Sequence, residues 1–246
     1  MGDKEPLIFQ RLLWEESINA VKQSLRFKDF RNFKRHLQEH LPQNSSYVRK
    51  RYTSSIIRWF FPDQSLNNLP AKVWHSYKNN QILQDVMRYF YLEKEPIVAE
   101  FICKYLIPLE PGTTMQSEYL KDFLIKKYGK VKKDPLNYLS AAIRDLGFTY
   151  RNKTTIIVCN LQLPKTSFTI LVHYLFASTP QTVSLEEILT HNFWMYLGIK
   201  NQSEVKKILK EADTKEIIAK YVVADQLEQI TTKYTLDEFL QKRIKL

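Results

Sequence analysis

Hydrophobic residues recur at helical spacing over most of the chain, with charged or polar residues between them. A helix is predicted from Phe30 to Leu41, because its apolar residues share one side and Pro42 stops it. After a short polar turn, another helix runs from Ser46 to about Phe61. Two helices joined by so short a turn predict a helix-turn-helix.

The segment from 113 to 159 shows a different order of elements. Asp134 and the proline after it indicate the cap and first turn of a helix that ends at Gly147. Two β-like runs follow, over 148–150 and 155–158, and Asn152 between them tolerates the left-handed conformation of a tight turn. Helix, helix and hairpin is the order of a winged helix.

A similar order recurs about 70 residues later, with little identity between the two segments. Ser184 and Glu187 form a predicted capping box. The predicted elements are a leading helix over 168–176, a helix over 185–197, a helix led by Ser203, strands over 217–223 and 227–231, and a closing helix over 236–244.

The predicted fold is therefore mainly α, with a helical N-terminal bundle that contains a helix-turn-helix. Two winged-helix-like units with short β-hairpins follow it. The predicted domains are residues 1–95, 96–160 and 161–246. These patterns set the frame in which charge and chemistry are judged.

Charge favours a polyanionic partner. Lys and Arg number 37 against 26 acidic residues, a net charge of +11. Residues 1–70 hold 12 basic and 7 acidic side chains, residues 71–160 hold 14 and 9, and residues 161–246 hold 11 and 10. The excess thus lies in the first two thirds and predicts nucleic acid or an anionic membrane face as partner; a merely solvated basic surface is the alternative.

Composition excludes several other classes. No apolar run approaches the ~18 residues of a membrane span, and no signal peptide is recognisable at the N-terminus. Two cysteines predict a reducing, cytoplasmic location without a disulfide framework. The five glycines form no phosphate-binding loop, so nucleotide hydrolysis and a bound cofactor are not expected.

The helix of residues 46–60 carries the first candidate surface. At 100° per residue, Val48, Tyr52, Ile56 and Trp59 face inward. The opposite arc collects Tyr47, Lys50, Arg51, Ser54 and Arg58, with Arg49 on its flank. No acid lies between Glu39 and Asp63, so we expect these residues to bind nucleic acid, unless acids from other elements neutralise them.

The helix of residues 135–146 carries the second candidate surface. It exposes small and amide residues that can enter a major groove, namely Asn137, Ser140, Ala141 and Arg144. Lysines precede it (Lys121, Lys126, Lys127, Lys130, Lys132 and Lys133), and Arg151 and Lys153 lie at the hairpin tip. Internal packing is the alternative for this unit.

In the predicted third domain, residues 161–246, nearby acids neutralise Lys206, Lys207 and Lys210. This neutralisation predicts a structural or protein-contact role for that domain.

One enzyme motif is present. The run from His36 to His40 matches H-x-x-E-H, the inverted zincin pattern, in which two histidines bind zinc and a glutamate is the base. Phe33 and Leu37 already occupy the inner face, and no third ligand is marked in the sequence. We therefore expect a polar, solvent-facing histidine pair, with no bound metal and no catalytic residues.

Three stretches resemble the BrxA family, the small component of bacteriophage-exclusion (BREX) defence islands. They are Leu12–Ser17, Asn44–Tyr52 with Ile56, Ile57 and Arg58 after it, and Tyr89–Phe90 with Ile97, Ala99, Glu100 and Phe101. The resemblance implies an all-helical fold with small winged parts, double-stranded DNA binding, and work beside a methyltransferase, an ATPase and a phosphatase-like protein. The family's inner-membrane label does not fit this sequence, and Phe193–Trp194 lie in its least similar part.

The sequence thus predicts a non-enzymatic, cytoplasmic, double-stranded DNA-binding component of a BREX-like defence system, which contacts mainly phosphates. Its other partners would be defence-system proteins; a small-molecule substrate and a membrane are not expected. The alternatives are a protein scaffold or adaptor and a winged-helix transcriptional regulator.

Overall fold

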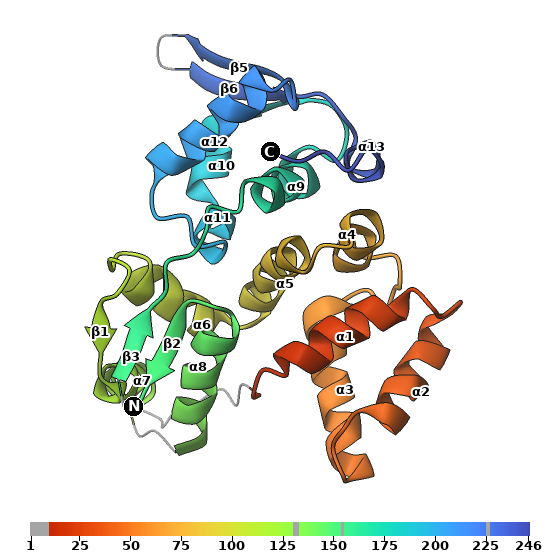
Figure 1. The fold of residues 1–246 in the computed structure, drawn as a ribbon, viewed down its shortest axis with the longest axis vertical. Coiled ribbons are helices and arrows are strands. Elements are labelled where there is room, and N and C mark those ends of the chain that lie inside the picture. Colours follow the sequence, from red (N-terminus) through yellow and green to blue (C-terminus); the bar gives the residue numbers. More distant parts are fainter. Residues whose placement is uncertain (1–9, 130–132, 154, 225–226) are drawn as a thin grey trace. The chain divides into compact units, whose positions relative to one another are not determined.

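The computed structural model describes residues 10–129, 133–153, 155–224 and 227–246. Within these ranges the chain is mainly helical and holds two small antiparallel sheets of three strands (Figure 1). The mainly-α prediction is confirmed. None of the described helices is long and apolar enough to cross a lipid bilayer.

The chain divides into two compact units, each built from two separate stretches. Unit 1 comprises Met1–Leu66 and Phe90–Gln162, and unit 2 comprises Asn67–Tyr89 and Leu163–Leu246. Helix α5 (Asn80–Lys94) contributes residues to both. This division places residues 67–89 with the C-terminal segment rather than with the N-terminal helices.

Unit 1 begins with three packed helices, α1, α2 and α3 (Figure 1). Their shared core is aromatic: the rings of Phe33 and Phe61 lie 4.8 Å apart, and Trp59 and Phe60 are fully buried. The bounds are α1 Trp14–Ser24, α2 Phe30–His40 and α3 Ser46–Phe60. The predicted turn between the second and third helices is therefore present.

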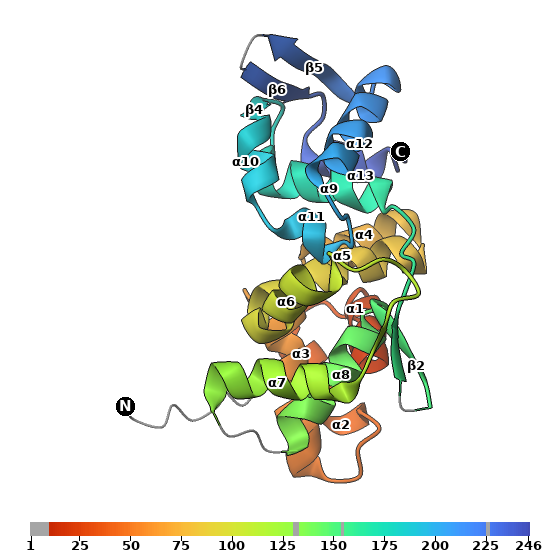
Figure 2. The same ribbon diagram turned by 90° about the vertical axis from the view of Figure 1, so that its left-hand side faces the viewer.

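The rest of unit 1 is a helical and β segment in which α7 and α8 pack together (Figure 2). Strand β3 is central in the sheet order β1-β3-β2. The elements are α6 Pro96–Phe101, a π-helical turn η1 Ile102–Leu106, β1 Thr114–Met115, α7 Ser117–Tyr128, α8 Lys133–Asp145, β2 Thr149–Asn152 and β3 Thr155–Val158. Gly147 ends α8 in the left-handed region, at φ +85°, as predicted.

Unit 2 repeats this order of elements. Its sheet order, β4-β6-β5, again has the last strand in the middle, and α10 lies beside it (Figure 2). The elements are α4 Leu69–Tyr77, α9 Lys165–Phe176, β4 Thr182–Ser184, α10 Leu185–Thr190, α11 Phe193–Tyr196, α12 Gln202–Thr214, β5 Ile218–Ala224, β6 Leu227–Thr232 and α13 Leu236–Gln241.

The prediction of one helix over 185–197 is wrong, because the backbone is extended at His191 and separates α10 from α11. A straight helix would place Trp194 half a turn away from the face of Leu185 and Ile188. The break allows all three side chains to be buried. Burial of Trp194 thus outweighs helix continuity.

Ser184 caps α10 as predicted, but its hydroxyl accepts from the amide of Glu186, so no box with Glu187 forms. Other predicted caps are wrong, since Asn201 rather than Ser203 caps α12. Asp134 lies within the first turn of α8. At the hairpin, Lys153 adopts the left-handed conformation, at φ +54°, and Asn152 belongs to the strand. The closing helix ends at Gln241, before Ile244.

Candidate nucleic-acid interface

Helix α3 presents a basic face on the side opposite its buried residues. This α3 basic face consists of Tyr47, Lys50, Arg51 and Ser54, all exposed, with Tyr47 74% exposed. Within the described residues neither Lys50 nor Arg51 pairs with an acid. The Ser54 hydroxyl donates to the Lys50 carbonyl at 3.1 Å, which leaves its oxygen lone pairs as acceptors. The face therefore offers two unpaired cations and an aromatic ring.

Arg49, predicted to bind nucleic acid, is used by the fold instead. Its Nε donates to the Gln38 carbonyl at 2.9 Å, and its Nη1 donates to the carbonyls of Gln43, at 2.7 Å, and Asn44, at 3.3 Å. These carbonyls belong to the end of α2 and to the turn after it. Arg49 thus fixes the start of α3 against α2, and it positions the α3 basic face.

Arg58 has a partner that the sequence does not reveal. Its guanidinium bonds to Glu95, whose side chain is 4% exposed and also accepts from Trp59 Nε1 at 2.7 Å. Burial raises the pKa of Glu95, and the bonds from Trp59 and Arg58 oppose that rise. The Arg58 side chain stays 49% exposed. Arg58 is therefore exposed, as predicted, but the stated alternative holds as well, because an acid from 37 residues later in the chain pairs with it.

A second basic surface lies on α2, and the sequence prediction missed it. Lys28, Arg31 and Lys34 are exposed, and no acid pairs with them among the described residues. Arg35 is exposed as well and donates to the Asn32 side chain. The sequence does contain a signal for this surface, because residues 22–35 hold six basic residues and one acid. We call Lys28, Arg31, Lys34 and Arg35 the α2 basic face.

Helix α8 presents the residues predicted for it only in part. Asn137 is exposed, whereas Ser140 and Ala141 are half-buried. Arg144 is exposed, but its Nε and Nη2 donate to the neighbouring Asp145 Oδ1 at 2.9 and 2.8 Å. The predicted contact Lys132 lies outside the described residues, and the other flanking residues, Lys133, Arg151 and Lys153, are exposed.

One hollow brings the two candidate helices of unit 1 together. It measures about 470 Å³, and both Tyr52 of α3 and Arg144 of α8 line it, together with Arg11 before α1. Glu15, Glu16 and Asp145 line it too, so its wall is mixed in charge. The hollow therefore brings Tyr52 of α3 near Arg144 of α8, and no basic residue of α3 lines it.

In unit 2 the predicted neutralisation of the α12 lysines by acids holds for Lys206 but not for Lys207 and Lys210 among the described residues. Lys206 pairs with Glu228 at 2.6 Å. Glu211 accepts from Lys165 at 2.6 Å and from Lys215 at 2.8 Å, and these bonds lower the pKa of Glu211 to about 2. Lys210 lies over the Tyr221 ring, and Lys207 is exposed.

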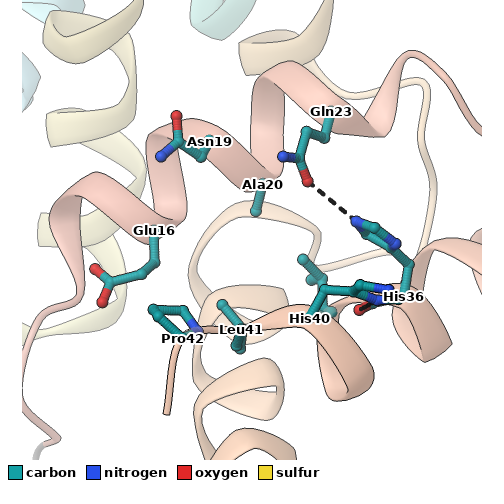
Figure 3. Close-up of a pocket in the computed structure, with 9 residues that line it drawn as sticks. Glu16, Asn19, Ala20, Gln23, His36, His40, Leu41 and Pro42 are labelled. Atoms are coloured by element: carbon teal, nitrogen blue, oxygen red, sulfur yellow. Dashed lines mark hydrogen bonds between the residues drawn. The ribbon is translucent and has the colours of Figure 1, made fainter.

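The H-x-x-E-H residues line a pocket of about 380 Å³ between α1 and α2 (Figure 3). The rings of His36 and His40 stack at 4.3 Å, and His36 Nε2 lies 3.3 Å from Gln23 Oε1. Glu39 is exposed. In the described ranges, no three His, Cys, Asp or Glu side chains gather as a metal-binding group.

Compared with protein-family models, with curated proteins and with solved structures, the chain matches none. The interpretation of its function therefore depends on the charges and contacts described above.

Proposed function

We propose that this chain is a non-enzymatic double-stranded DNA-binding protein whose main DNA contact is unit 1. The observation that carries the proposal is the pair of basic faces on adjacent helices α2 and α3, whose cations lack acidic partners among the described residues. Counted over the sequence, unit 1 holds 23 basic and 15 acidic residues, and unit 2 holds 14 and 11. Unit 1 is thus the electropositive half of the protein.

The order of the two helices indicates which part of the DNA each of them would contact. In a helix-turn-helix the second helix enters the major groove, while the first crosses the backbone. By this analogy α3 inserts Lys50, Arg51 and Ser54 toward base edges, and the α2 basic face binds phosphates. Arg49 keeps the two helices in register, because it ties α3 to backbone carbonyls at the end of α2.

The segment from α6 to β3 supplies the second DNA contact in this proposal. Helix, short strand, two helices and a hairpin is the order of a winged helix, with α8 as the groove helix and the hairpin as its wing. Asn137 and Arg144 would then face bases, and Arg151 and Lys153 would reach phosphates. Arg144 can donate to a base through Nη1 while its Nε and Nη2 stay bonded to Asp145.

The biological setting that we infer is a bacterial BREX-like anti-phage defence system. The resemblance of the three stretches described above to the BrxA family supports it, and so does the electropositive unit 1. In that setting the chain works with other defence proteins at DNA, without a small-molecule substrate, cofactor or membrane.

A scaffold is the second candidate, and one feature of unit 2 favours it. Strand β5 is an edge strand, its Val223 is 57% exposed, and the nearby Lys206 is paired with Glu228. An exposed edge strand with an apolar residue suits protein contact better than DNA contact. A winged-helix transcriptional regulator would share the DNA-binding surfaces and differ in sequence preference.

The test is a duplex-DNA binding assay with matched variants. Lys50→Glu with Arg51→Glu removes two cations from α3, and Lys207→Glu with Lys210→Glu makes the same charge change on α12. We expect the α3 variant to weaken binding by about 2–4 kcal/mol, or about 30- to 1000-fold. The α12 variant should bind nearly as the unchanged protein does.

Both variants alter exposed residues, so each unfolding free energy should change by about 0.5 kcal/mol or less per substitution. If the unchanged protein fails to shift duplex DNA at low salt, the DNA-binding proposal is wrong and the scaffold is favoured. If both variants weaken binding equally, general basicity rather than α3 is responsible.

A further inference from the structure

His36 and His40 lie one turn apart at the C-terminal end of α2, where neither is needed for the DNA contacts proposed above. His40 is exposed, and His36 is half-buried, with its ring 5.1 Å from that of Phe27. Their rings are nearly parallel, at an angle of 20° (Figure 3). Two imidazoles so close cannot both carry a proton cheaply, because like charges at this distance repel.

Hydrogen bonds fix the tautomer of each ring. His40 Nδ1 lies 3.0 Å from the His36 carbonyl, which can only accept, so Nδ1 holds the proton. His36 Nε2 lies 3.3 Å from Gln23 Oε1 and donates to it for the same reason. The lone pairs that remain are on His36 Nδ1 and His40 Nε2.

This arrangement has the features of a metal-ligand pair. A histidine that binds a metal usually donates its other nitrogen to a carbonyl or carboxylate, which orients the ring. A helical side chain leans toward the N-terminus, so the distal nitrogen of His40 reaches back toward the proximal nitrogen of His36. The helix C-terminus also favours positive charge.

We propose that His36 and His40 form an open site for one divalent late transition-metal ion, with Cu²⁺ preferred over Ni²⁺ and Zn²⁺. Imidazole suits these ions, and their affinities follow that order at a given nitrogen site. The rings turn out of their stack so that the two lone pairs converge on the ion. No third acidic, cysteine or histidine ligand lies nearby in the described ranges, so water fills the other positions.

This site differs from both a zinc protease and a structural zinc centre. A structural zinc has four protein ligands and a catalytic one has three, whereas two histidines hold an exchangeable ion. Bound metal would join the last turn of α2 to the turn before it. The protein would consequently gain stability that rises with the logarithm of the free metal concentration once this exceeds the dissociation constant.

The test is titration of Cu²⁺, and separately Zn²⁺, into the untagged full chain in a non-coordinating buffer, followed by calorimetry. We expect one Cu²⁺ per chain and pulsed electron paramagnetic resonance signals from two imidazoles. His40→Ala, at an exposed position, should weaken binding more than about tenfold, as loss of a metal-site residue does. His75→Ala, which removes an exposed histidine of α4, should leave affinity unchanged.

Equal affinity in the unchanged protein and in His40→Ala would overturn the proposal, and so would a site with a single imidazole. Duplex-DNA binding is measured separately, so failure here does not affect the proposed function.

Discussion

The segments 96–158 and 165–232 share one order of elements and one sheet order, yet they differ in charge, with 10 basic and 6 acidic residues in the first and 7 and 8 in the second. In the first, the exposed Lys133, Arg151 and Lys153 have no acidic partner among the described residues. In the second, acids pair with Lys165, Lys206 and Lys215, whereas Lys207 and Lys210 have no acidic partner among the described residues. Architecture alone therefore does not assign DNA binding; the proposal that unit 1 binds DNA depends on the excess of basic residues there.

The buried ion pairs of the two units differ as well. In unit 2, Asp85 and Arg88 are 2% and 4% exposed, and Asp85 also accepts from Ser167 Oγ at 2.8 Å and Gln81 Nε2 at 2.9 Å. In unit 1, Arg58 is half-exposed beside the buried Glu95. The fully buried Asp85–Arg88 pair helps to select one folded structure, whereas the Arg58–Glu95 pair leaves its arginine accessible to solvent.

The largest expected effect follows from this difference. Arg88→Met should lower the free energy of unfolding by about 3–5 kcal/mol, because it leaves the Asp85 carboxylate uncompensated in the interior. Arg58→Met should cost less, since water reaches that site. Chemical denaturation measures both, and a greater loss for Arg58→Met would contradict the comparison.

An effect of intermediate size is expected on the discrimination among DNA bases. Arg144→Ala should leave stability nearly unchanged, because Arg144 is exposed and, among the described residues, its side chain bonds only to the neighbouring Asp145. It should reduce discrimination among DNA sequences by about 1–3 kcal/mol at the base that it reads. Binding to a panel of duplexes checks this prediction, with Lys206→Ala on α12 as the control. Unaltered preference in Arg144→Ala would assign α8 to packing alone.

The smallest effect is a pH dependence of unit 2. His173 is fully buried, donates through Nδ1 to the Thr169 carbonyl at 2.8 Å, and has no partner at Nε2 in the described structure. Burial lowers the pKa of His173 below its usual 6.5, so the unfolded chain binds the proton more readily. Stability is therefore full above pH 6.5 and falls as the pH drops below it.

The loss should reach at most about 1.4 kcal/mol per pH unit from this histidine. Melting temperatures between pH 7.5 and 5 measure it. The fall should be shallower in His173→Phe, which packs against Phe239 without a titrating group. An equal fall in both proteins would assign the acid sensitivity to other groups.

Local elements were predictable where periodicity and turn chemistry agreed. The spacing of hydrophobic residues predicts the hairpin strands β2 and β3 and the strands β5 and β6. Pro42 and Gly147 predict the C-terminal ends of α2 and α8. The exposed positions of Lys50 and Arg51 follow from helix geometry alone. These features depend on neighbours within a few residues.

What could not be predicted depends on residues distant in sequence. Glu95 neutralises Arg58 from 37 positions away, and Arg49 bonds to carbonyls whose direction only the folded turn determines. The break between α10 and α11 arises because Trp194 is buried. The α2 basic face is the exception, since its charge run was visible and only its exposure required the fold.

The most direct test of the account is the salt dependence of duplex-DNA binding. Each phosphate contact releases condensed counterion, with a log–log slope of roughly −0.9 per contact. With about four to six contacts from the two basic faces, we expect a slope of about −4 to −5. Lys50→Glu with Arg51→Glu should make it shallower by about 2, and Lys207→Glu with Lys210→Glu should leave it unchanged. An affinity independent of salt, or an equal change of slope in both variants, would contradict the claim that unpaired cations of unit 1 bind DNA.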